Sequence, residues 1–336
     1  MQYPSILPLL PILSKILEKI ILKRLTPIIE DNKLIPSHQF GFRKHHGTVE
    51  QAHRLVNKIH NDLENKRYCS TVFLDISQAF DKVWHNGLFY KLKRAFPHTA
   101  YTLLKSYLSD RTFQVRYQEE CTTLHAIQSG VPQGSILGPI LYLLYTADLP
   151  ETANTMTATY ADDTAILASH ENSNTASQHL QHHLHQLEKW LTKWRIKVNE
   201  NKSTHVTFGL RRETCPAVTL NGHSIPQRET AKYLGIHLDR RLTWQKHIFT
   251  KRKQLGLQLH RMYWIIGRKS QLSLENKLLL YKTIIKPIWT YGIPLWGTAS
   301  NSNIDILQRF QNKVLHGMYR ILSYTPTCRY PQSRQK

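Results

Sequence analysis

Cysteine, acidic residues and long apolar runs are all scarce in this chain of 336 residues, and each shortage argues against a class of protein. The four cysteines are far apart and form no C-x-x-C pair, which disfavours a zinc site and a disulfide-stabilised secreted domain. No stretch reaches the ~20 apolar residues of a membrane span. The apolar start of the chain is interrupted by Lys15, Glu18 and Lys19, unlike a signal peptide. We therefore expect a soluble protein in a reduced compartment.

Positive charge, in contrast, is abundant. The chain has 45 Lys and Arg residues against 23 Asp and Glu residues, a formal net charge of +22. Such an excess repels itself, so it suggests a polyanionic partner, with nucleic acid as the first candidate and an anionic membrane surface as the second. The imbalance is greatest from Asp239 to Lys286, which holds 12 Lys or Arg residues and 2 acids.

The periodicity of apolar residues predicts a chain that mixes helices and strands. Helices are expected near residues 13–25, 48–66, 79–96, 135–149 and 180–194. Strands are expected at 70–75, 155–160, 164–169, 203–209 and 231–239, with a hairpin of exposed strands at 112–130. The remainder after residue 240 reads as mostly helical.

Three carboxylates stand at the ends of the predicted strands. Asp75 ends the apolar strand 70–75, and Asp162 and Asp163 lie side by side at the turn between the strands 155–160 and 164–169. Asp is common in turns, so a plain hairpin turn explains the pair equally well. If the strands are neighbours in one sheet, however, the carboxylates converge and would hold divalent cations. Two such ions about 3.5–4 Å apart would activate a hydroxyl and stabilise a leaving phosphate.

Around these carboxylates the sequence resembles a known family. The blocks "FLDISQAFDKVWH" (73–85), "SGVPQGSILGPILY" (129–142) and "YADDTAIL" (160–167) look like the palm motifs of reverse transcriptases. They are most similar to those of non-LTR (LINE-type) retrotransposons, in particular the Jockey-like elements of arthropods. Further blocks upstream and downstream follow the family's order, so the resemblance covers about residues 10–320.

This resemblance implies a fold, a reaction and a set of partners. The fold would be the α+β right-hand polymerase fold, with fingers and palm in residues 1–240 and a thumb or C-terminal helical region, truncated, in 241–336. The reaction would be RNA-directed DNA synthesis with two Mg²⁺ ions, or Mn²⁺ in their place. The partners would be an RNA template, a DNA primer and deoxynucleoside triphosphates, in the nucleus or in a cytoplasmic ribonucleoprotein.

The resemblance also implies roles for individual residues. Asp75, Asp162 and Asp163 match the metal-binding aspartates, and the backbone of Ile76 would face the second ion. Phe80 matches a bulky residue that crowds the 2′ position of the incoming nucleotide, although a core residue would look the same.

Four further residues match blocks around the active site. Gln133 and Gly134 match the loop that lies against template and nucleotide, for which a helix-capping loop is the alternative. Arg43 matches a residue that could reach the triphosphate, and Lys202 matches a possible proton donor to pyrophosphate. A solvated surface charge explains Arg43 equally well, and for Lys202 it is the default explanation.

Two other interpretations stay open on the sequence alone. The family's complete proteins carry an endonuclease domain before the polymerase, and nothing here resembles it, so the chain could be a silent, truncated remnant that only binds nucleic acid. A basic protein of membrane surfaces is the third interpretation, but it leaves the three carboxylates unexplained.

Overall fold

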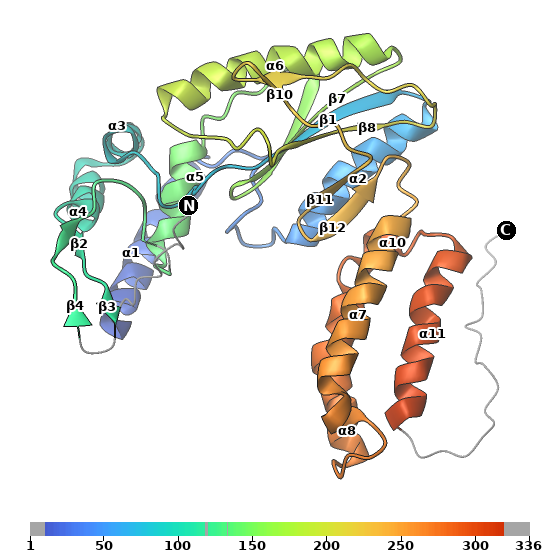
Figure 1. Cartoon of the computed structure of the whole chain (residues 1–336). Coiled ribbons are helices and arrows are strands. Elements are labelled where there is room, and N and C mark those ends of the chain that lie inside the picture. The colour runs from blue at the N-terminus through green and yellow to red at the C-terminus, as the bar shows by residue number, and fades with distance from the viewer. Residues whose placement is uncertain (1–10, 118–119, 133, 319–336) are drawn as a thin grey trace. The chain divides into compact units, whose positions relative to one another are not determined.

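The computed structural model describes residues 11–117, 120–132 and 134–318 (Figure 1). The chain forms two compact units, one up to Leu242 and one from Thr243 onward. Helices and strands are mixed in the first unit, whereas the described part of the second is built from helices.

A four-stranded antiparallel sheet forms the centre of the first unit. Its order is β6 (Thr155–Tyr160), β7 (Asp163–His170), β1 (Tyr68–Leu74) and β8 (Thr204–Phe208). Every residue of β1 is buried, as expected for a β-branched and apolar strand with a neighbour on each side. The predicted α+β class, with its antiparallel sheet, is confirmed.

Two long helices cover opposite faces of this sheet. Ser70 of β1 lies within 3.5 Å of Ser177 on α6 (Ser173–Lys193), and the neighbouring Cys69 contacts Asp62 on α2 (Thr48–Glu64). Because consecutive strand residues point to opposite faces, α6 and α2 lie on opposite sides of the sheet, as Figure 1 shows.

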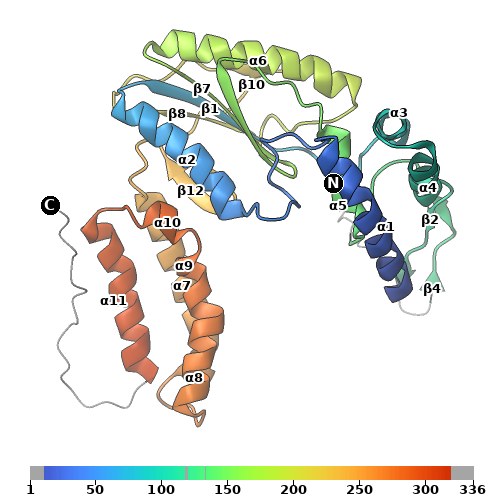
Figure 2. The ribbon, with the colours of Figure 1, turned by 180° about the vertical axis from the view of Figure 1, so that it is seen from behind.

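Four more helices pack beside the sheet: α1 (Ile12–Asp31), α3 (His85–Ala95), α4 (His98–Leu108) and α5 (Leu137–Thr146). Figure 2 shows α1 alongside α5. Pro139 is the third residue of α5, where its missing N–H leaves no hydrogen bond unmade. Ile21, Leu25 and Ile29 of α1 are buried, but Leu13 and Leu17 from the same predicted apolar face are exposed. The helix prediction was therefore right, while only part of its apolar face is covered.

The sequence prediction of a helix over 79–96 was wrong at its start. Residues 79–82 form turns, and α3 begins only at His85. The carbonyl of Phe80 accepts the N–H of Val131 at 2.8 Å, and the carbonyl of Val83 accepts the N–H of Gly130 at 2.8 Å. These bonds to a distant segment replace the local helical bonds that the spacing of apolar residues had predicted.

Short strands complete the first unit. The predicted hairpin at 112–130 forms the pairs β2 (Thr112–Phe113) with β5 (His125–Ala126) and β3 (Arg116–Tyr117) with β4 (Glu120–Cys121). Two further hairpins follow the sheet: β9 (Thr219–Leu220) with β10 (His223–Ser224), and β11 (Thr230–Tyr233) with β12 (Ile236–Asp239).

The second unit is a helical assembly. Its long helices α7 (Gln245–Ile266) and α11 (Asn301–Met318) pack together, and the shorter ones are α8 (Leu274–Leu280), the π-helix η1 (Tyr281–Ile285), α9 (Lys286–Thr290) and α10 (Ile293–Trp296). Buried Ile248 and Leu255 of α7 and Phe310 and Val314 of α11 belong to its apolar interior. Within the described ranges, no helix of either unit is long and apolar enough to cross a membrane.

Candidate active site

The register of the central sheet brings the predicted carboxylates together. Leu74 at the end of β1 is paired with Thr164 of β7, so Asp75 and Asp163 leave this ladder at the same edge. Tyr160 pairs with Asp163 across the β6–β7 hairpin, which leaves Ala161 and Asp162 as its two-residue turn. Asp75, Asp162 and Asp163 therefore meet at one end of the sheet, as predicted from the strand pattern.

The backbone of Asp75 is held from the β8 side. Its N–H donates to the Ser203 hydroxyl at 3.1 Å, and its carbonyl accepts the N–H of Asn199 at 2.8 Å. The Ser203 hydroxyl donates in turn to the carbonyl of Asn199 at 2.8 Å. Ser203 is fully buried, so the backbone of Asp75 is bound to the protein interior. The residue Asp75 itself is exposed.

The carboxylates influence one another's protonation. Partial burial raises the pKa of Asp162; a hydrogen bond from its own backbone opposes the rise, and the negative charge of Asp75 adds to it. Partial burial also raises the pKa of Asp163, as do the charges of Asp162 and Asp75, while Lys232 on β11 lowers it. The negative charges gathered at this edge disfavour the ionised forms of Asp162 and Asp163, so the site attracts cations.

A main-chain oxygen faces the same region. Ile76 pairs with Val198 between two hydrogen bonds, from Asn199 N–H to Asp75 O and from Ser77 N–H to Lys197 O at 2.9 Å. In such a non-hydrogen-bonded pair, the N–H and C=O of the residue point away from the partner strand. The Ile76 carbonyl is thus directed away from the β8 side, toward the side of β1 on which β7 lies.

The three carboxylates do not enclose an ion by themselves. Among the described residues, no group of three or more His, Cys, Asp or Glu side chains is arranged to hold a metal ion. This agrees with the chemistry of Mg²⁺, which is usually bound through one or two carboxylates, waters and substrate phosphates rather than by an all-protein cage. The donor set of carboxylates and a carbonyl fits a hard cation that is shared with a substrate.

Phe80 joins the site through the 129–131 segment. Its carbonyl is bound to Val131, and its half-buried ring packs on Tyr142, with centroids 4.7 Å apart, and edge-on to Phe42 at 6.2 Å. The ring therefore contacts the core, as the core-residue interpretation expected. Its backbone lies five residues after Asp75 and binds Val131, three residues before Gly134, so Phe80 belongs to a segment that links these two parts of the chain.

The loop before α5 is anchored by a buried carboxylate. Gly134 is exposed and has a φ of 82°, a conformation that favours glycine, while Gln133 lies outside the described residues. Glu18 of α1, 1% exposed, accepts the N–H groups of Ile136 at 2.6 Å and Leu137 at 3.3 Å. This carboxylate caps the start of α5, where negative charge is favourable. It thereby fixes the end of the loop that carries Gly134.

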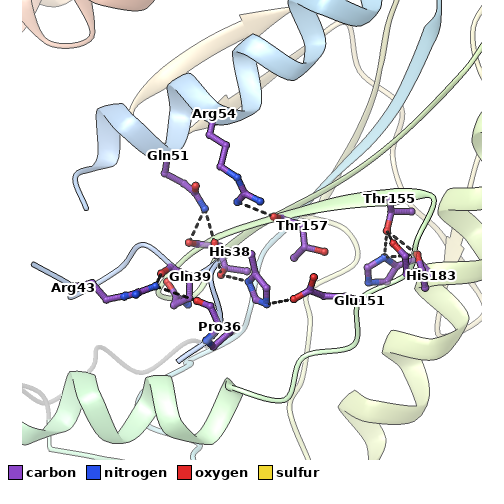
Figure 3. A network of polar contacts seen from close by, with 12 residues as sticks. Pro36, His38, Gln39, Arg43, Gln51, Arg54, Glu151, Thr155, Thr157 and His183 are labelled. Atoms are coloured by element: carbon purple, nitrogen blue, oxygen red, sulfur yellow. Dashed lines mark hydrogen bonds and ion pairs between the residues drawn. The ribbon is translucent and has the colours of Figure 1, made fainter. Parts of the chain in front are cut away.

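Two predicted basic residues lie on segments that contact the backbone of the site. The half-buried Arg43 donates through Nη1 to the carbonyls of Pro36 at 3.2 Å and Gln39 at 3.0 Å, as Figure 3 shows. The guanidinium of Arg43 therefore stabilises the loop 36–43. Lys202 is exposed and directly precedes Ser203, which places it on the segment that binds Asp75.

Four residues that support this region were not predicted to belong to the site from the sequence. Glu18 served only as an argument against a signal peptide, although a charge inside an apolar helix could have suggested a buried role. Gln39 lies in the upstream block "HQFGFRKHHGT", and Ser203 in a polar run. Lys232 begins a block that matched the family, but its position beside Asp163 depends on the tertiary fold.

Comparisons with known proteins show the family of the chain. The profile of the family "Reverse transcriptase (RNA-dependent DNA polymerase)" matches residues 5–238. The chain is 43% identical over 311 residues to a probable RNA-directed DNA polymerase from transposon X-element, and 42% identical over 315 residues to the RNA-directed DNA polymerase from mobile element jockey, both of Drosophila melanogaster. Each match covers 91% of this chain and 34% of the relative, so the chain spans about a third of the length of these curated relatives.

A solved structure shows a more distant likeness. Telomerase from Candida tropicalis, in complex with a fragment of telomeric RNA, is 16% identical with a TM-score of 0.45, over 91% of this chain and 52% of that one. The family profile and the Drosophila relatives therefore carry the assignment of the family. The right-hand polymerase fold that the sequence predicted is the fold of that family. The chain therefore belongs to the reverse transcriptase family, and the relatives that it is similar to include the jockey-like retrotransposon polymerases that its motifs indicated.

Proposed function

We propose that this chain is an RNA-directed DNA polymerase that adds deoxynucleotides to the 3′-hydroxyl of a primer. The observation that carries the proposal is the pairing of Leu74 with Thr164, which brings Asp75 beside Asp163 and the Asp162 turn. Membership of the reverse transcriptase family supports the choice of reaction. The net charge of +22 supports a nucleic-acid substrate.

In this proposal, Asp75, Asp162 and Asp163 hold two Mg²⁺ ions together with the main-chain oxygen of Ile76. When bound, such ions lower the pKa of an attacking hydroxyl and stabilise the charge on the transferring phosphate. The carboxylates supply the negative charge that holds the ions, and Ser203 and Asn199 keep the backbone at Asp75 in place.

The surrounding residues would bind and orient the nucleotide. Phe80 would lie under the sugar and exclude a 2′-hydroxyl. The loop of Gln133 and Gly134 would lie against the base pair, since glycine lets the backbone approach a ligand closely. Arg43 would donate to the triphosphate with the N–H groups that do not bind its own loop. Lys202 would donate a proton to the departing pyrophosphate.

The second unit would serve as a thumb that holds the primer–template duplex. From Thr243 to Met318 its described residues include only two acids, Glu275 and Asp305, against twelve Lys and Arg residues. Phosphate groups are the natural counter-ions for such a surface, because binding them releases the cations condensed on the nucleic acid.

Primer extension tests the proposal. The purified chain is given a DNA primer annealed to an RNA template, with all four deoxynucleoside triphosphates and Mg²⁺, and product length is followed on a sequencing gel. We expect template-dependent extension that stops when Mg²⁺ is chelated. Binding of the duplex without extension, across Mg²⁺ and Mn²⁺, would instead indicate a nucleic-acid-binding remnant.

A further inference from the structure

The turn that carries Asp162 contains a strained residue. Ala161 has a φ of 57°, and it occupies the first position of a two-residue hairpin turn. Glycine is the usual residue at such a position, because a side chain makes positive φ unfavourable. Ala161 is also buried, with 8% of its surface exposed, so its peptide groups need partners inside the protein.

The amide of Gln39 supplies those partners. Gln39 Oε1 accepts the N–H of Ala161 at 2.9 Å, and Gln39 Nε2 donates to the carbonyl of Ala161 at 3.3 Å. The same Oε1 accepts the N–H of Gly41 at 2.8 Å. The oxygen and the nitrogen of one buried amide therefore bind both backbone groups of Ala161, the residue that precedes Asp162. The Gln39 side chain that carries this amide belongs to a residue that is 4% exposed.

Gly41 allows this close approach. A Cβ atom at Gly41 would lie 2.3 Å from the backbone nitrogen of Ala161, which no real contact permits. The short run Gln39–Gly41 therefore combines a side chain that binds the turn with a backbone that leaves room for it.

Other contacts fasten the same loop to β6, as Figure 3 shows. The Nε2 of Gln51, on α2, donates to the carbonyls of His38 at 2.8 Å and Thr159 at 2.9 Å. The N–H of Phe40 donates to the carbonyl of Thr159 at 3.0 Å. These bonds hold the loop against the strand but do not reach Ala161, so among the described contacts of this loop those of Gln39 are the side-chain bonds that act on Ala161.

We propose that Gln39 is a positioning residue for the catalytic turn: its amide holds Ala161 in the left-handed conformation and thereby sets the direction of Asp162. This inference rests on the proposed polymerase function. A carboxylate that shares an ion with a substrate must be placed accurately, and displacement by about 1 Å can cost roughly a hundredfold in rate.

The test compares Gln39→Met with Gln51→Met. Both replace a buried amide by an apolar side chain of similar length, and both weaken the attachment of the same loop to the same strand. We expect both variants to lower Tm. Below their Tm, Gln39→Met should reduce kcat roughly tenfold to a hundredfold with unchanged affinity for primer–template, whereas Gln51→Met should retain most of its kcat.

A second substitution tests the cause. Because glycine adopts positive φ without penalty, Ala161→Gly should partly restore kcat in the Gln39→Met background and leave the Gln51→Met variant unchanged. Equal kcat in Gln39→Met and Gln51→Met, or no recovery on adding Ala161→Gly, would overturn the proposal.

Amide hydrogen exchange provides a readout that does not depend on activity. Gln39→Met should speed exchange across residues 161–163, whereas Gln51→Met should speed it at the 38–40 loop and spare the turn. Equal exchange of the turn in both variants would contradict the role of Gln39, even if the wild-type chain extends no primer. Absence of extension with the expected exchange pattern would count against the polymerase function alone.

Discussion

Leu74 and Thr164 are direct partners across the β1–β7 ladder, and this pairing decides where Asp75, Asp162 and Asp163 lie. A shift of one residue would turn the side chains of one strand to the other face of the sheet and separate Asp75 from the Asp162 turn. The completely buried β1 opposes such a shift, because every displaced apolar side chain would lose its packing.

Replacing Asp162 with Asn should abolish primer extension while primer–template binding survives. The substitution keeps the shape of the side chain but removes one of the charges that would hold the ions. Extension should fall by at least about a hundredfold, as for other losses of transition-state electrostatics. Asp31→Asn, the same change at the exposed end of α1, is the control and should extend normally. Wild-type extension by Asp162→Asn would rule out the two-metal assignment.

The pKa shifts of the carboxylates predict how stability depends on pH. Because the folded chain raises the pKa of Asp162 and Asp163, it binds protons more tightly than the unfolded chain. Their contribution to the free energy of unfolding should therefore decline as pH rises from the ordinary Asp value of about 4 through the raised values. Asp163→Asn should accordingly have a higher Tm than wild type at pH 7, and this advantage should disappear below pH ~4.

Mg²⁺ should reduce this difference in Tm between Asp163→Asn and the wild type. Bound cations favour the ionised carboxylates, so Mg²⁺ at pH 7 should raise the Tm of the wild type more than that of Asp163→Asn. Differential scanning fluorimetry at both pH values, with and without Mg²⁺, measures both effects. An Asp163→Asn variant that is less stable than wild type at pH 7 without Mg²⁺ would show that the carboxylates do not repel one another.

Phe80→Val separates the two interpretations of Phe80. Because the ring packs on Tyr142, its loss should cost about 1–3 kcal/mol in the free energy of unfolding, less than for a fully buried Phe. If Phe80 also crowds the sugar, the ratio of kcat/KM for ribonucleotides to that for deoxynucleotides should rise. Phe89→Val, at a half-buried ring on α3, is the matched control and should lower stability without changing the ratio. An unchanged ratio in Phe80→Val would remove that residue from the nucleotide site.

Glu18→Gln should loosen the loop that carries Gly134. The amide oxygen can still accept both N–H groups, which share Oε2 of the carboxylate, but the negative charge at the start of α5 is lost and the NH₂ group would face the hydroxyls of Ser14 and Tyr107. We expect a loss of about 1–3 kcal/mol in the free energy of unfolding, together with a higher KM for the incoming nucleotide. Tyr107→Phe is the milder control, because it removes the bond from the Tyr107 hydroxyl to Glu18 at 3.0 Å but leaves the capping carboxylate in place. A Glu18→Gln loss no larger than that of Tyr107→Phe would show that capping α5 is unimportant.

Neutralising Lys251, Arg252 and Lys253 should weaken the salt dependence of nucleic-acid binding. Each phosphate contact contributes a slope of about −0.9 in log K against log salt, so the slope should become shallower by as much as ~3. The control removes the same charge from the exposed Lys93, Lys189 and Lys193 of the first unit. Fluorescence anisotropy over a salt series measures both slopes.

An unchanged slope in the Lys251, Arg252 and Lys253 variant would place the duplex elsewhere. Arg252 also lies over the ring of Phe310, with its guanidinium carbon 4.6 Å from the ring centre. The Tm of the variant must therefore be measured as well, so that lost packing is not mistaken for lost phosphate contacts.

The strand pattern alone was enough to find the three aspartates and to expect them together. Asp75 stands where an apolar strand ends, and Asp162 and Asp163 stand between two short strands, so local alternation marks them. The turns at 79–82 were not predictable in this way. Their apolar spacing suits a helix, and only the bonds of Phe80 and Val83 to the 129–131 segment favour turns.

The sequence by itself determined the family, the strands, most helices and the three carboxylates that gather at the sheet edge, because each depends on residues near one another in the chain. Tertiary structure alone decided the supports of those carboxylates. Gln39 meets Ala161, Ser203 meets Asp75 and Glu18 meets Ile136 across 122, 128 and 118 positions of the chain. A buried polar side chain must find its hydrogen-bond partner wherever the fold places one, and no local periodicity records that choice.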